Sequence, residues 1–347
     1  MIIQENVPLA PLTTFKVGGP ARYFVEARSE QEVHAAVEHA QARGLPLFVL
    51  GGGSNVVVSD RGWPGLVLKV GLRGIEERRD AGKAIFYVAA GEDWDEFVVH
   101  CVARNCAGVE CLSGIPGTVG GTPVQNVGAY GQEVANTITQ VRVLDTTSGQ
   151  VVDLENSNSG FAYRTSIFNT RERGRYIVLR VTFALTSEGA PHIEYADLKK
   201  HFAGQSNPPT LQETREAVRA IRLSKAMLIV AGDDDCRSAG SFFKNPLLAR
   251  EQYEQLRSIA DAVPNWPAGD GKVKVAAAWL VEHAGFSKGL IRGPVGISRR
   301  HALAIVNRGG ATAADIVALK NEIQQRVGEK FGIALQPEPV FVGFDKV

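Results

Sequence analysis

The first fifty residues alternate between short apolar runs and one stretch with helical spacing. Between residues 33 and 40, apolar side chains recur every three or four positions, as on one face of an amphipathic helix. Ser29-Glu30-Gln31-Glu32 precedes this stretch as a capping box, and Gly44 is placed to end the helix. The apolar runs 23–27 and 47–50 predict flanking strands, the second of them buried. The chain therefore begins with an α/β unit.

Similar patterns continue to the end of the chain. Strands are predicted at residues 66–70, 85–90, 140–144, 150–154, 176–185 and 303–306. Helices are predicted from Asp93 to about Asn105, over 211–225, 249–259 and 273–284, and from a capping box at Thr312 to Gly332. Thr146-Thr147-Ser148-Gly149 joins two of the strands as a hairpin turn. The mixture predicts an α/β or α+β protein.

The segment Ala231-Gly232-Asp233-Asp234-Asp235 interrupts this pattern with a polar run. Three adjacent aspartates could indicate a cation site, but no glycine and glutamate follow them at the spacing of a calcium-binding loop. We therefore interpret the run as a solvated loop and as a domain boundary.

Composition narrows the class of protein. The chain has 347 residues, 44% of them apolar, which is enough for two or three domains with their own cores. A formal net charge of +1 argues against nucleic acid as a partner. The N-terminal residues lack the charged and apolar regions of a secretory signal, and no run of about 18 apolar residues predicts a membrane span. We expect a cytoplasmic protein without membrane contact.

The cysteines and histidines do not form a recognisable metal motif. Cys101, Cys106 and Cys111 are spaced five apart, which matches no common zinc or iron–sulfur pattern, and Cys236 is isolated. We expect four reduced, partly buried thiols and no metal site.

Two glycine-rich loops are the strongest signs of a ligand. Gly51-Gly52-Gly53-Ser54-Asn55 follows a predicted strand, but Val56 stands where a dinucleotide fingerprint needs its third glycine. A glycine run can direct several backbone N–H groups at one anion, although it is equally typical of a plain tight turn. The second loop, Ser113 to Pro123, is too glycine-rich for a helix or strand and too apolar for a disordered linker. Together the loops favour a large, phosphate-bearing ligand.

A serine between a glycine and two phenylalanines is the strongest sign of chemistry. In Ser238-Ala239-Gly240-Ser241-Phe242-Phe243-Lys244-Asn245-Pro246, the aromatic rings could exclude water from the Ser241 hydroxyl. The same pattern also describes a small serine in a buried strand beside an aromatic core.

These motifs, in this order and spacing, resemble the UDP-N-acetylenolpyruvoylglucosamine reductase family of flavoenzymes, in its type I branch. The resemblance covers nearly the whole chain and is carried by residues 11–19, 51–55, 115–121, 125–131, 163–168, 240–246 and 337–338. Two positions depart from the family pattern: Asn169 stands where lysine is frequent, and Ala162 where glycine is frequent.

The resemblance implies a fold and a reaction. It implies a two-domain FAD-binding module of the vanillyl-alcohol-oxidase type followed by a C-terminal α+β substrate-binding domain. The corresponding boundaries are 1–225 for the FAD region, with subdomains of about 1–70 and 71–225, then 226–333 for the substrate domain and 334–347 for a returning tail. It further implies that a monomer with non-covalent FAD uses NADPH to reduce UDP-N-acetylglucosamine enolpyruvate to UDP-N-acetylmuramate, a peptidoglycan precursor.

The resemblance also assigns the catalytic roles. Ser241 would deliver a proton to the substrate carbon, and the planar Arg164 guanidinium suits the carboxylate on which charge develops. Glu338 would be an acid or electrostatic partner near the same carbon. Lys225 and Lys244 are both candidates to support the serine, and the sequence does not choose between them. Without the resemblance, Arg164 and Glu338 would pass for ordinary surface charges.

Ligand contacts follow from the same resemblance. The substrate contacts are Tyr195, on a loop that closes over the substrate, Lys225, Asn245 and His301. The FAD contacts are Gly51, Gly52, Gly53, Ser54, Asn55, Ser113, Gly114, Ile115, Pro116, Gly117, Gly120, Gly121, Asn126, Gly128, Ala129 and Tyr130.

Two other functions compete with this interpretation. One is an oxidase of the same flavin fold with covalently attached FAD, for which Cys106 and Cys111 lie near a glycine loop but form no clear attachment motif. The other is a non-catalytic nucleotide-sugar binder, which would not need Ser241, Arg164 and Glu338 together.

Overall fold

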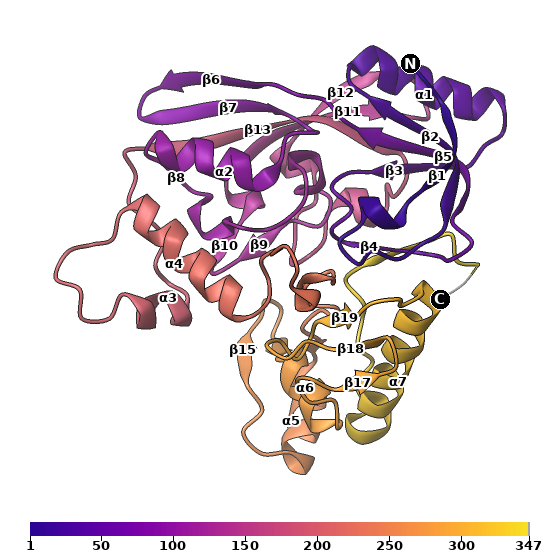
Figure 1. The fold of residues 1–347 in the computed structure, drawn as a ribbon. Coiled ribbons are helices and arrows are strands. Elements are labelled where there is room, and N and C mark those ends of the chain that lie inside the picture. The colour runs from indigo at the N-terminus through magenta and orange to yellow at the C-terminus, as the bar shows by residue number, and fades with distance from the viewer. Residues whose placement is uncertain (346–347) are drawn as a thin grey trace. The chain divides into compact units, whose positions relative to one another are not determined.

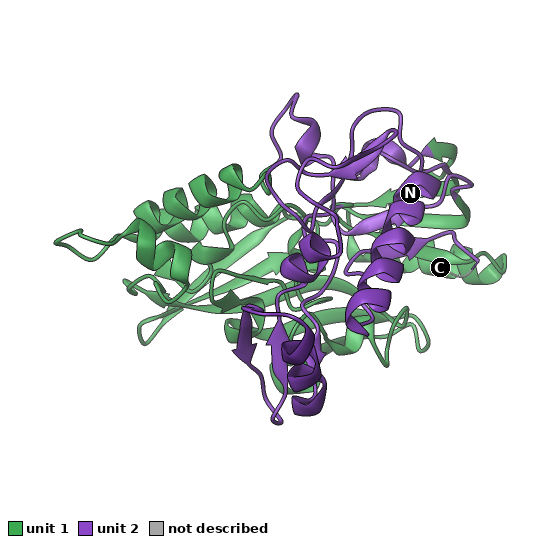
Figure 2. Cartoon of the chain, turned by 90° about the horizontal axis from the view of Figure 1, so that it is seen from below, with its two compact units in different colours: residues 1–7, 21–53, 63–228 green, residues 8–20, 54–62, 229–347 purple. Residues whose placement is uncertain are grey.

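In a computed structural model that describes residues 1–345, the chain forms two compact units (Figure 2). The first unit comprises residues 1–7, 21–53 and 63–228. The second comprises residues 8–20, residues 54–62 and the chain from residue 229 onward.

This division differs from the contiguous boundaries expected from the sequence. Segments 8–20 and 54–62 lie in the part expected to bind FAD, yet they pack with the second unit. The reason is apolar burial: Phe15, Val17 and Val57 are all at most 2% exposed and belong to the hydrophobic core of the second unit.

The first unit contains a four-stranded sheet (Figure 1). Its strand order is β1 (Gln4–Pro8), β2 (Pro20–Ala27), β5 (Trp63–Val70) and β3 (Leu47–Leu50). Strands β2, β5 and β3 are parallel, and α1 (Glu30–Ala42) supplies the crossover that parallel neighbours require. Ser29 caps α1 by accepting from the Glu32 N–H, as the capping box predicts.

A larger antiparallel sheet forms the rest of the scaffold of this unit. Its strand order is β12 (Val151–Glu155), β11 (Ile138–Asp145), β13 (Tyr176–Ser187), β7 (Lys83–Ala89) and β6 (Ile75–Asp80), and β8 (Cys106–Ala107) also pairs with β13. The predicted hairpin is confirmed, because Gln140 to Leu144 of β11 pair with Glu155 to Val151 of β12.

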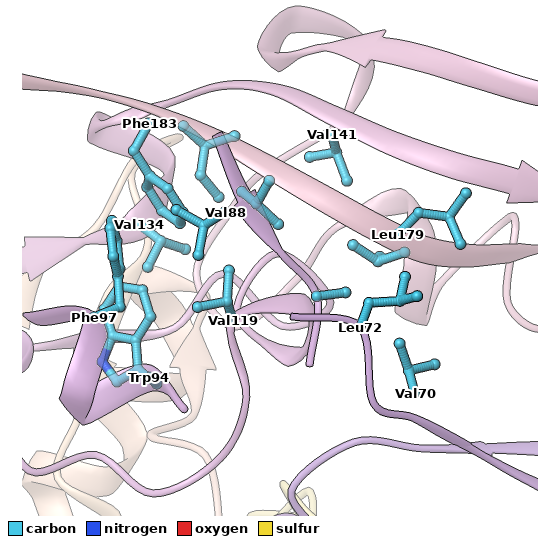
Figure 3. Packing of buried hydrophobic residues seen from close by; sticks show 14 of the residues in the cluster. Val70, Leu72, Val88, Trp94, Phe97, Val119, Val134, Val141, Leu179 and Phe183 are labelled. Carbon is cyan, nitrogen blue, oxygen red and sulfur yellow. The ribbon is translucent and has the colours of Figure 1, made fainter. Parts of the chain in front are cut away.

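The core of the first unit contains an aromatic cluster beneath this sheet (Figure 3). Helix α2 (Trp94–Ala103) contributes Trp94 and Phe97, and β13 contributes Phe183. The ring centroids of Phe97 and Phe183 are 5.0 Å apart, and all three side chains are fully buried. Large aromatic side chains bury much apolar area, so this packing fixes α2 against the sheet.

Two further helices and a short strand pair complete the first unit. Helix α3 (Ala196–His201) contacts α4 (Leu211–Ser224), while β9 (Gly128–Ala129) pairs with β10 (Gln132–Glu133). A capping box formed by Thr210 and Glu213 begins α4.

Up to residue 345, the second unit is made of small sheets and three α-helices. The helices are α5 (Arg250–Ile259), α6 (Ala277–His283) and α7 (Ala313–Phe331). The strands form one sheet of β14 (Leu247–Leu248), β16 (Val273–Val275) and β15 (Asn265–Pro267), another of β17 (Ile291–Arg292), β18 (Val295–Ile297) and β19 (Ile305–Asn307), and a parallel pair of β4 (Val56–Val58) and β20 (Val340–Val342).

The helix predicted from Thr312 to Gly332 is confirmed as α7. Its capping box is formed by Thr312 and Asp315, and Gly332 ends it with φ +67°. Its apolar face, represented by Ile316 and Ile323, is fully buried.

Three expectations from the sequence are wrong in part. The stretch 273–284 is not one helix, because residues 273–275 pair with β14 and β15 before α6 begins. Strand β3 is not buried throughout, since Val49 is 37% exposed. Asp235 does not lie in a solvated loop: its side chain is 1% exposed and surrounded by arginines, which compensate the cost of burying its charge.

Within residues 1–345, no helix is long and apolar enough to cross a membrane. Over the same range, no three His, Cys, Asp or Glu side chains are grouped to hold a metal ion. All four cysteines are buried as thiols.

Candidate active site

The two glycine loops lie against each other within the first unit. A Cβ atom on Gly52 would lie 2.5 Å from the Cα atom of Gly117, and one on Gly51 would lie 2.9 Å from the Thr118 hydroxyl. Gly53 has φ +66°, in the left-handed region that favours glycine. Side chains at these positions would force the loops apart, so the glycines allow a close approach of the two backbones, which we call the glycine cradle.

A half-buried carboxylate, that of Asp95, anchors the second glycine loop to helix α4. The Gly114 N–H donates to Asp95 Oδ1 over 2.6 Å, and Arg215 donates to both carboxylate oxygens over 2.6 and 3.0 Å. Arg219 adds a bond of 2.7 Å. Burial alone would raise the pKa of Asp95, but the bonds from Arg215 and Gly114 outweigh it and lower that pKa. Sequence reasoning missed Asp95, because an acid in the first turn of a helix is interpreted as a capping residue.

Arg164 occupies a tight turn held to the loop that contains Asn126. Both residues have positive φ, +54° and +46°. The Asn126 amide donates to the Ala162 carbonyl over 3.0 Å, and Arg164 Nη2 donates to the Gly128 carbonyl over 2.5 Å. Asn169, one of the departures from the family pattern, donates to the Arg164 carbonyl over 3.2 Å. Asn169 therefore closes this turn, which holds the guanidinium beside residues 126–128.

Tyr195 and Lys225 also lie close to this loop. The Tyr195 ring packs edge-on against Tyr130, with centroids 5.3 Å apart, and remains 43% exposed. Lys225 Nζ donates to Asp197 over 2.6 Å. Burial would lower the pKa of Lys225, but its bond to Asp197 outweighs this and raises it, so the ammonium keeps its charge. A phenol and a cation at the ends of α3 and α4 suit an anionic ligand.

Glu110 supports the chain segment that leads to Tyr195. This carboxylate is fully buried and accepts hydrogen bonds from the Gly108 N–H, the Gln132 amide and the His192 N–H over 2.7 to 2.9 Å. Three donors satisfy the buried charge. No sequence pattern pointed to Glu110, because its donors come from three separate segments.

Arg222 supplies a buried donor beside the second glycine loop. It is 5% exposed, and its Nη2 donates to the Met227 carbonyl over 2.7 Å. Among the described residues its buried Nε has no hydrogen-bond partner, and a Cβ atom on Gly114 would lie 3.4 Å from it. An unpaired buried N–H next to a glycine cradle fits an acceptor on a bound group. The residues present therefore fit a phosphate-bearing cofactor such as FAD.

In the second unit, the Ser241 segment pairs with the C-terminal segment that carries Glu338. The Glu338 N–H donates to the Phe242 carbonyl over 2.8 Å, and Phe243 bridges Pro337 in antiparallel fashion. Phe242 and Phe243 are at most 2% exposed, while Ser241 is half-buried. The structure thus brings together two expected catalytic residues that are almost a hundred positions apart.

Other expected contacts join this set. The Asn55 amide donates to the Glu338 carbonyl over 3.3 Å, so the end of the first glycine loop lies beside the C-terminal segment. Asn245 accepts from the Ala277 N–H over 2.9 Å at the start of α6. His301 lies on the turn before Leu303, whose carbonyl accepts from the Phe242 N–H over 2.9 Å.

The expected site residues therefore form two groups, each compact within its unit. The first unit holds Gly51–Gly53, Ser113–Gly121, Asn126–Tyr130, Arg164, Tyr195 and Lys225. The second holds Ser54, Asn55, Ser241, Asn245, His301 and Glu338, with Lys244. Of the two lysines considered as support for Ser241, Lys244 shares its unit and Lys225 pairs with Asp197 in the other.

Two family models match the chain. An FAD binding domain matches residues 21–155, and the C-terminal domain of UDP-N-acetylenolpyruvoylglucosamine reductase matches residues 232–342. These matches confirm the expected order of an FAD-binding region followed by a C-terminal domain.

Similar proteins cover nearly the whole chain. The UDP-N-acetylenolpyruvoylglucosamine reductase of Thermobifida fusca is 46% identical over 98% of this chain and 98% of its own. That of Streptomyces coelicolor is 46% identical over 98% of this chain and 91% of its own. Among solved structures, the reductase of Thermus caldophilus aligns with a TM-score of 0.67 at 27% identity, covering 98% of this chain and 100% of that chain.

Proposed function

The chain belongs to the UDP-N-acetylenolpyruvoylglucosamine reductase family, and on this premise we propose that it reduces UDP-N-acetylglucosamine enolpyruvate to UDP-N-acetylmuramate. Non-covalent FAD is the cofactor and NADPH the reductant. The reaction adds a hydride to the terminal alkene carbon and a proton to the neighbouring carbon, so the enzyme must deliver both to the substrate.

The pairing of the Ser241 and Glu338 segments is the observation that carries this proposal. Backbone bonds from the Glu338 N–H to the Phe242 carbonyl (2.8 Å) and from the Lys244 N–H to the Gln336 carbonyl (3.0 Å) join the two segments. Ser241, which precedes two buried aromatic residues, therefore lies on the segment paired with that of Glu338. A hydroxyl proton donor on a segment paired with a second ionisable residue suits protonation of carbon. A protein that only binds a nucleotide sugar does not need this arrangement.

Arg164 is proposed to bind the substrate carboxylate. Hydride addition leaves carbanion character on the carbon beside that carboxylate, so negative charge grows there in the transition state. A fixed, planar guanidinium forms two parallel hydrogen bonds with a carboxylate, which a lysine cannot do. The bond from Arg164 to the Gly128 carbonyl and the turn closed by Asn169 limit the freedom of this side chain.

The proton is proposed to come from the Ser241 hydroxyl. Serine is a weak acid, so a neighbouring charge has to stabilise the alkoxide or replace its proton. Lys244 lies three residues along the same segment, and Glu338 lies across it. We assign Glu338 the electrostatic or acidic role at the same substrate carbon.

The glycine loops and Asn126–Tyr130 are proposed to hold FAD, which when bound carries the hydride from NADPH to the substrate. The Gly52–Gly117 cradle and the unpaired Arg222 Nε support this assignment. Tyr195, Lys225, Asn245 and His301 are proposed to bind the UDP-sugar. On this basis residues 1–225 form the FAD-binding region, of the vanillyl-alcohol-oxidase type, and residues 226–333 the substrate-binding domain, followed by the tail 334–347.

The cellular role follows from the product. UDP-N-acetylmuramate is a precursor of peptidoglycan, so the enzyme would support cell-wall synthesis, cell shape and division. We propose that it acts as a monomer in the cytoplasm, which agrees with four cysteines kept as thiols.

A visible spectrum of the purified protein tests the proposal. The holoenzyme should show a flavin spectrum that bleaches with NADPH under anaerobic conditions and returns when the enolpyruvyl sugar is added. Flavin released by acid precipitation would exclude a covalent oxidase. A colourless protein that cannot be reconstituted with FAD, or a reduced flavin that the sugar never reoxidises, would refute the proposed function.

A further inference from the structure

The aspartate run of the second unit has an unexpected environment. The Asp235 side chain is 1% exposed and lies among three arginines from a distant part of the chain. Its Oδ2 accepts from Arg299 Nε over 3.1 Å and from the Arg299 N–H over 3.3 Å, and its Oδ1 lies 3.4 Å from Arg308 Nη1. Arg300 Nε lies 3.7 Å from the carboxylate. A buried charge with this many partners fixes the segments that supply them.

The neighbouring aspartates reinforce one side of this arrangement. Asp233 accepts from Arg300, and it also caps the short 3₁₀ turn Asp234–Cys236 by accepting from the Asp235 N–H over 3.0 Å. Asp234 is different, because its ion-pair partner within residues 1–345 is Arg237, over 3.1 Å, and both side chains are about two-fifths exposed. Asp235 is therefore the buried centre of the run, and Asp234 is a solvent-facing neighbour.

The two segments that Asp235 joins are the ones that carry proposed site residues. Five residues separate Asp235 from Ser241, and Arg299 and Arg300 lie directly before His301. Beyond Asp235, a backbone bond of 2.9 Å from the Phe242 N–H to the Leu303 carbonyl links the same two segments a second time. A further backbone bond of 3.0 Å runs from the Asn307 N–H to the Arg237 carbonyl. Without Asp235, the turn at Arg299 and Arg300 would be held by the Asp233–Arg300 pair and by these two backbone bonds.

We propose that Asp235 is the positioning residue that holds the His301 turn in register with the Ser241 segment. The expected effect on the reaction rate rests on the proposed function, whereas the expected effect on the placement of the two segments does not. Reactions that depend on oriented groups lose about a hundredfold in rate for a displacement of about 1 Å. Proton delivery from Ser241 is the step that should suffer.

Asp235→Asn tests the proposal, with Asp234→Asn as the matched control. In anaerobic stopped-flow experiments on the holoenzyme, Asp235→Asn should slow flavin reoxidation at saturating enolpyruvyl sugar by about 10- to 100-fold. It should leave flavin reduction by NADPH within about twofold of wild type, because that step needs no serine proton. Asp234→Asn should stay within about twofold in both steps, as exposed pairs contribute little.

A structural readout separates placement from general damage. Hydrogen–deuterium exchange should accelerate in peptides covering residues 238–243 and 298–304 of Asp235→Asn, and stay unchanged over α7. If Asp235→Asn does not fold, Arg299→Gln can be measured instead. The Arg299 side chain is 63% exposed, and its replacement removes one hydrogen-bond donor from Asp235. It should slow reoxidation by about three- to tenfold, a fraction of the effect of full displacement.

The results that overturn the proposal are distinct from those that overturn the function. Wild-type rates and wild-type hydrogen exchange in Asp235→Asn and Arg299→Gln would mean that Asp235 does not position these segments. Equal slowing of both half-reactions would mean the same. A wild-type enzyme that the sugar fails to reoxidise would refute the proposed function instead. The exchange measurement alone would then decide the role of Asp235.

Discussion

Replacing Ser241 by alanine should separate the two half-reactions of the enzyme. The substitution removes one hydroxyl and keeps every backbone bond of the segment, including Phe242 N–H to Leu303 and Glu338 N–H to Phe242. Because Ser241 is only half-buried, we expect a change in the free energy of unfolding of less than about 1 kcal/mol. The variant should fold and retain flavin, so its defect would be chemical.

The size of the defect follows from what the hydroxyl supplies. Loss of a general acid costs about 10²- to 10⁴-fold in rate, or about 3–5 kcal/mol of transition-state stabilisation. The buried Phe242 and Phe243 make it harder for water to replace the serine, which places the expected loss at the upper end of this range. Reduction by NADPH transfers a hydride and needs no serine proton.

Stopped-flow absorbance of the flavin measures each step. Ser241→Ala should bleach with NADPH at the wild-type rate and then stay reduced for seconds to minutes after the enolpyruvyl sugar is added. Ser238→Ala is a control, because it removes a hydroxyl of the same segment that accepts from the Gly240 N–H over 3.2 Å. It should change reoxidation by no more than a few-fold. Equal slowing of both steps in Ser241→Ala would show that the hydroxyl is structural, and the proton donor would have to be sought elsewhere.

Three further predictions concern other parts of the molecule. Arg164→Lys keeps the charge but loses the planar fork, so turnover should fall about a hundredfold or more, and near wild-type turnover would mean that Arg164 does not bind the carboxylate. Gly52→Val should raise the FAD dissociation constant measured by flavin fluorescence, because its Cβ atom would lie 2.5 Å from Gly117; unchanged affinity would remove this glycine from the cofactor site. Hydrogen bonds from Arg175 lower the pKa of Asp145 to about 2, so its stabilising contribution is complete above about pH 4 and is lost as the pH falls through 2. Urea unfolding of Asp145→Asn should therefore show a deficit against wild type that is largest near neutrality and vanishes below about pH 2, and a deficit independent of pH would contradict this cause.

The elements with strong local signals were predictable from the sequence. Helix α7 was fixed by its capping box at Thr312, by its apolar period and by Gly332, and the β11–β12 hairpin by its turn residues. The short β16 strand was missed because its apolar run continues into α6, and periodicity cannot distinguish a short buried strand from the start of a helix.

The catalytic candidates were predictable as motifs, but their supporting residues were not. Ser241 and Arg164 stand in distinctive local sequences. Asp95, Glu110 and Asp235 act through partners that are distant along the chain, such as the bond from Arg215 to Asp95 across 120 residues. A single sequence holds no information on such pairs. Asp235 was therefore interpreted as part of a solvated loop, although its side chain is buried among three arginines.

The discontinuous second unit also has a consequence for synthesis on the ribosome. The first unit is complete once residue 228 has emerged, whereas Phe15 has to wait for Phe242, whose ring lies 6.1 Å from its own, and for Asn307, whose amide bonds its carbonyl. At about 5–20 residues per second, the 226 residues between the two phenylalanines take about 10–45 s to translate. During that interval the apolar segments 8–20 and 54–62 protrude from an otherwise folded nascent chain. Exposed apolar segments favour aggregation, so translation that stops before residue 242 should give a chain that aggregates more readily than the full-length protein.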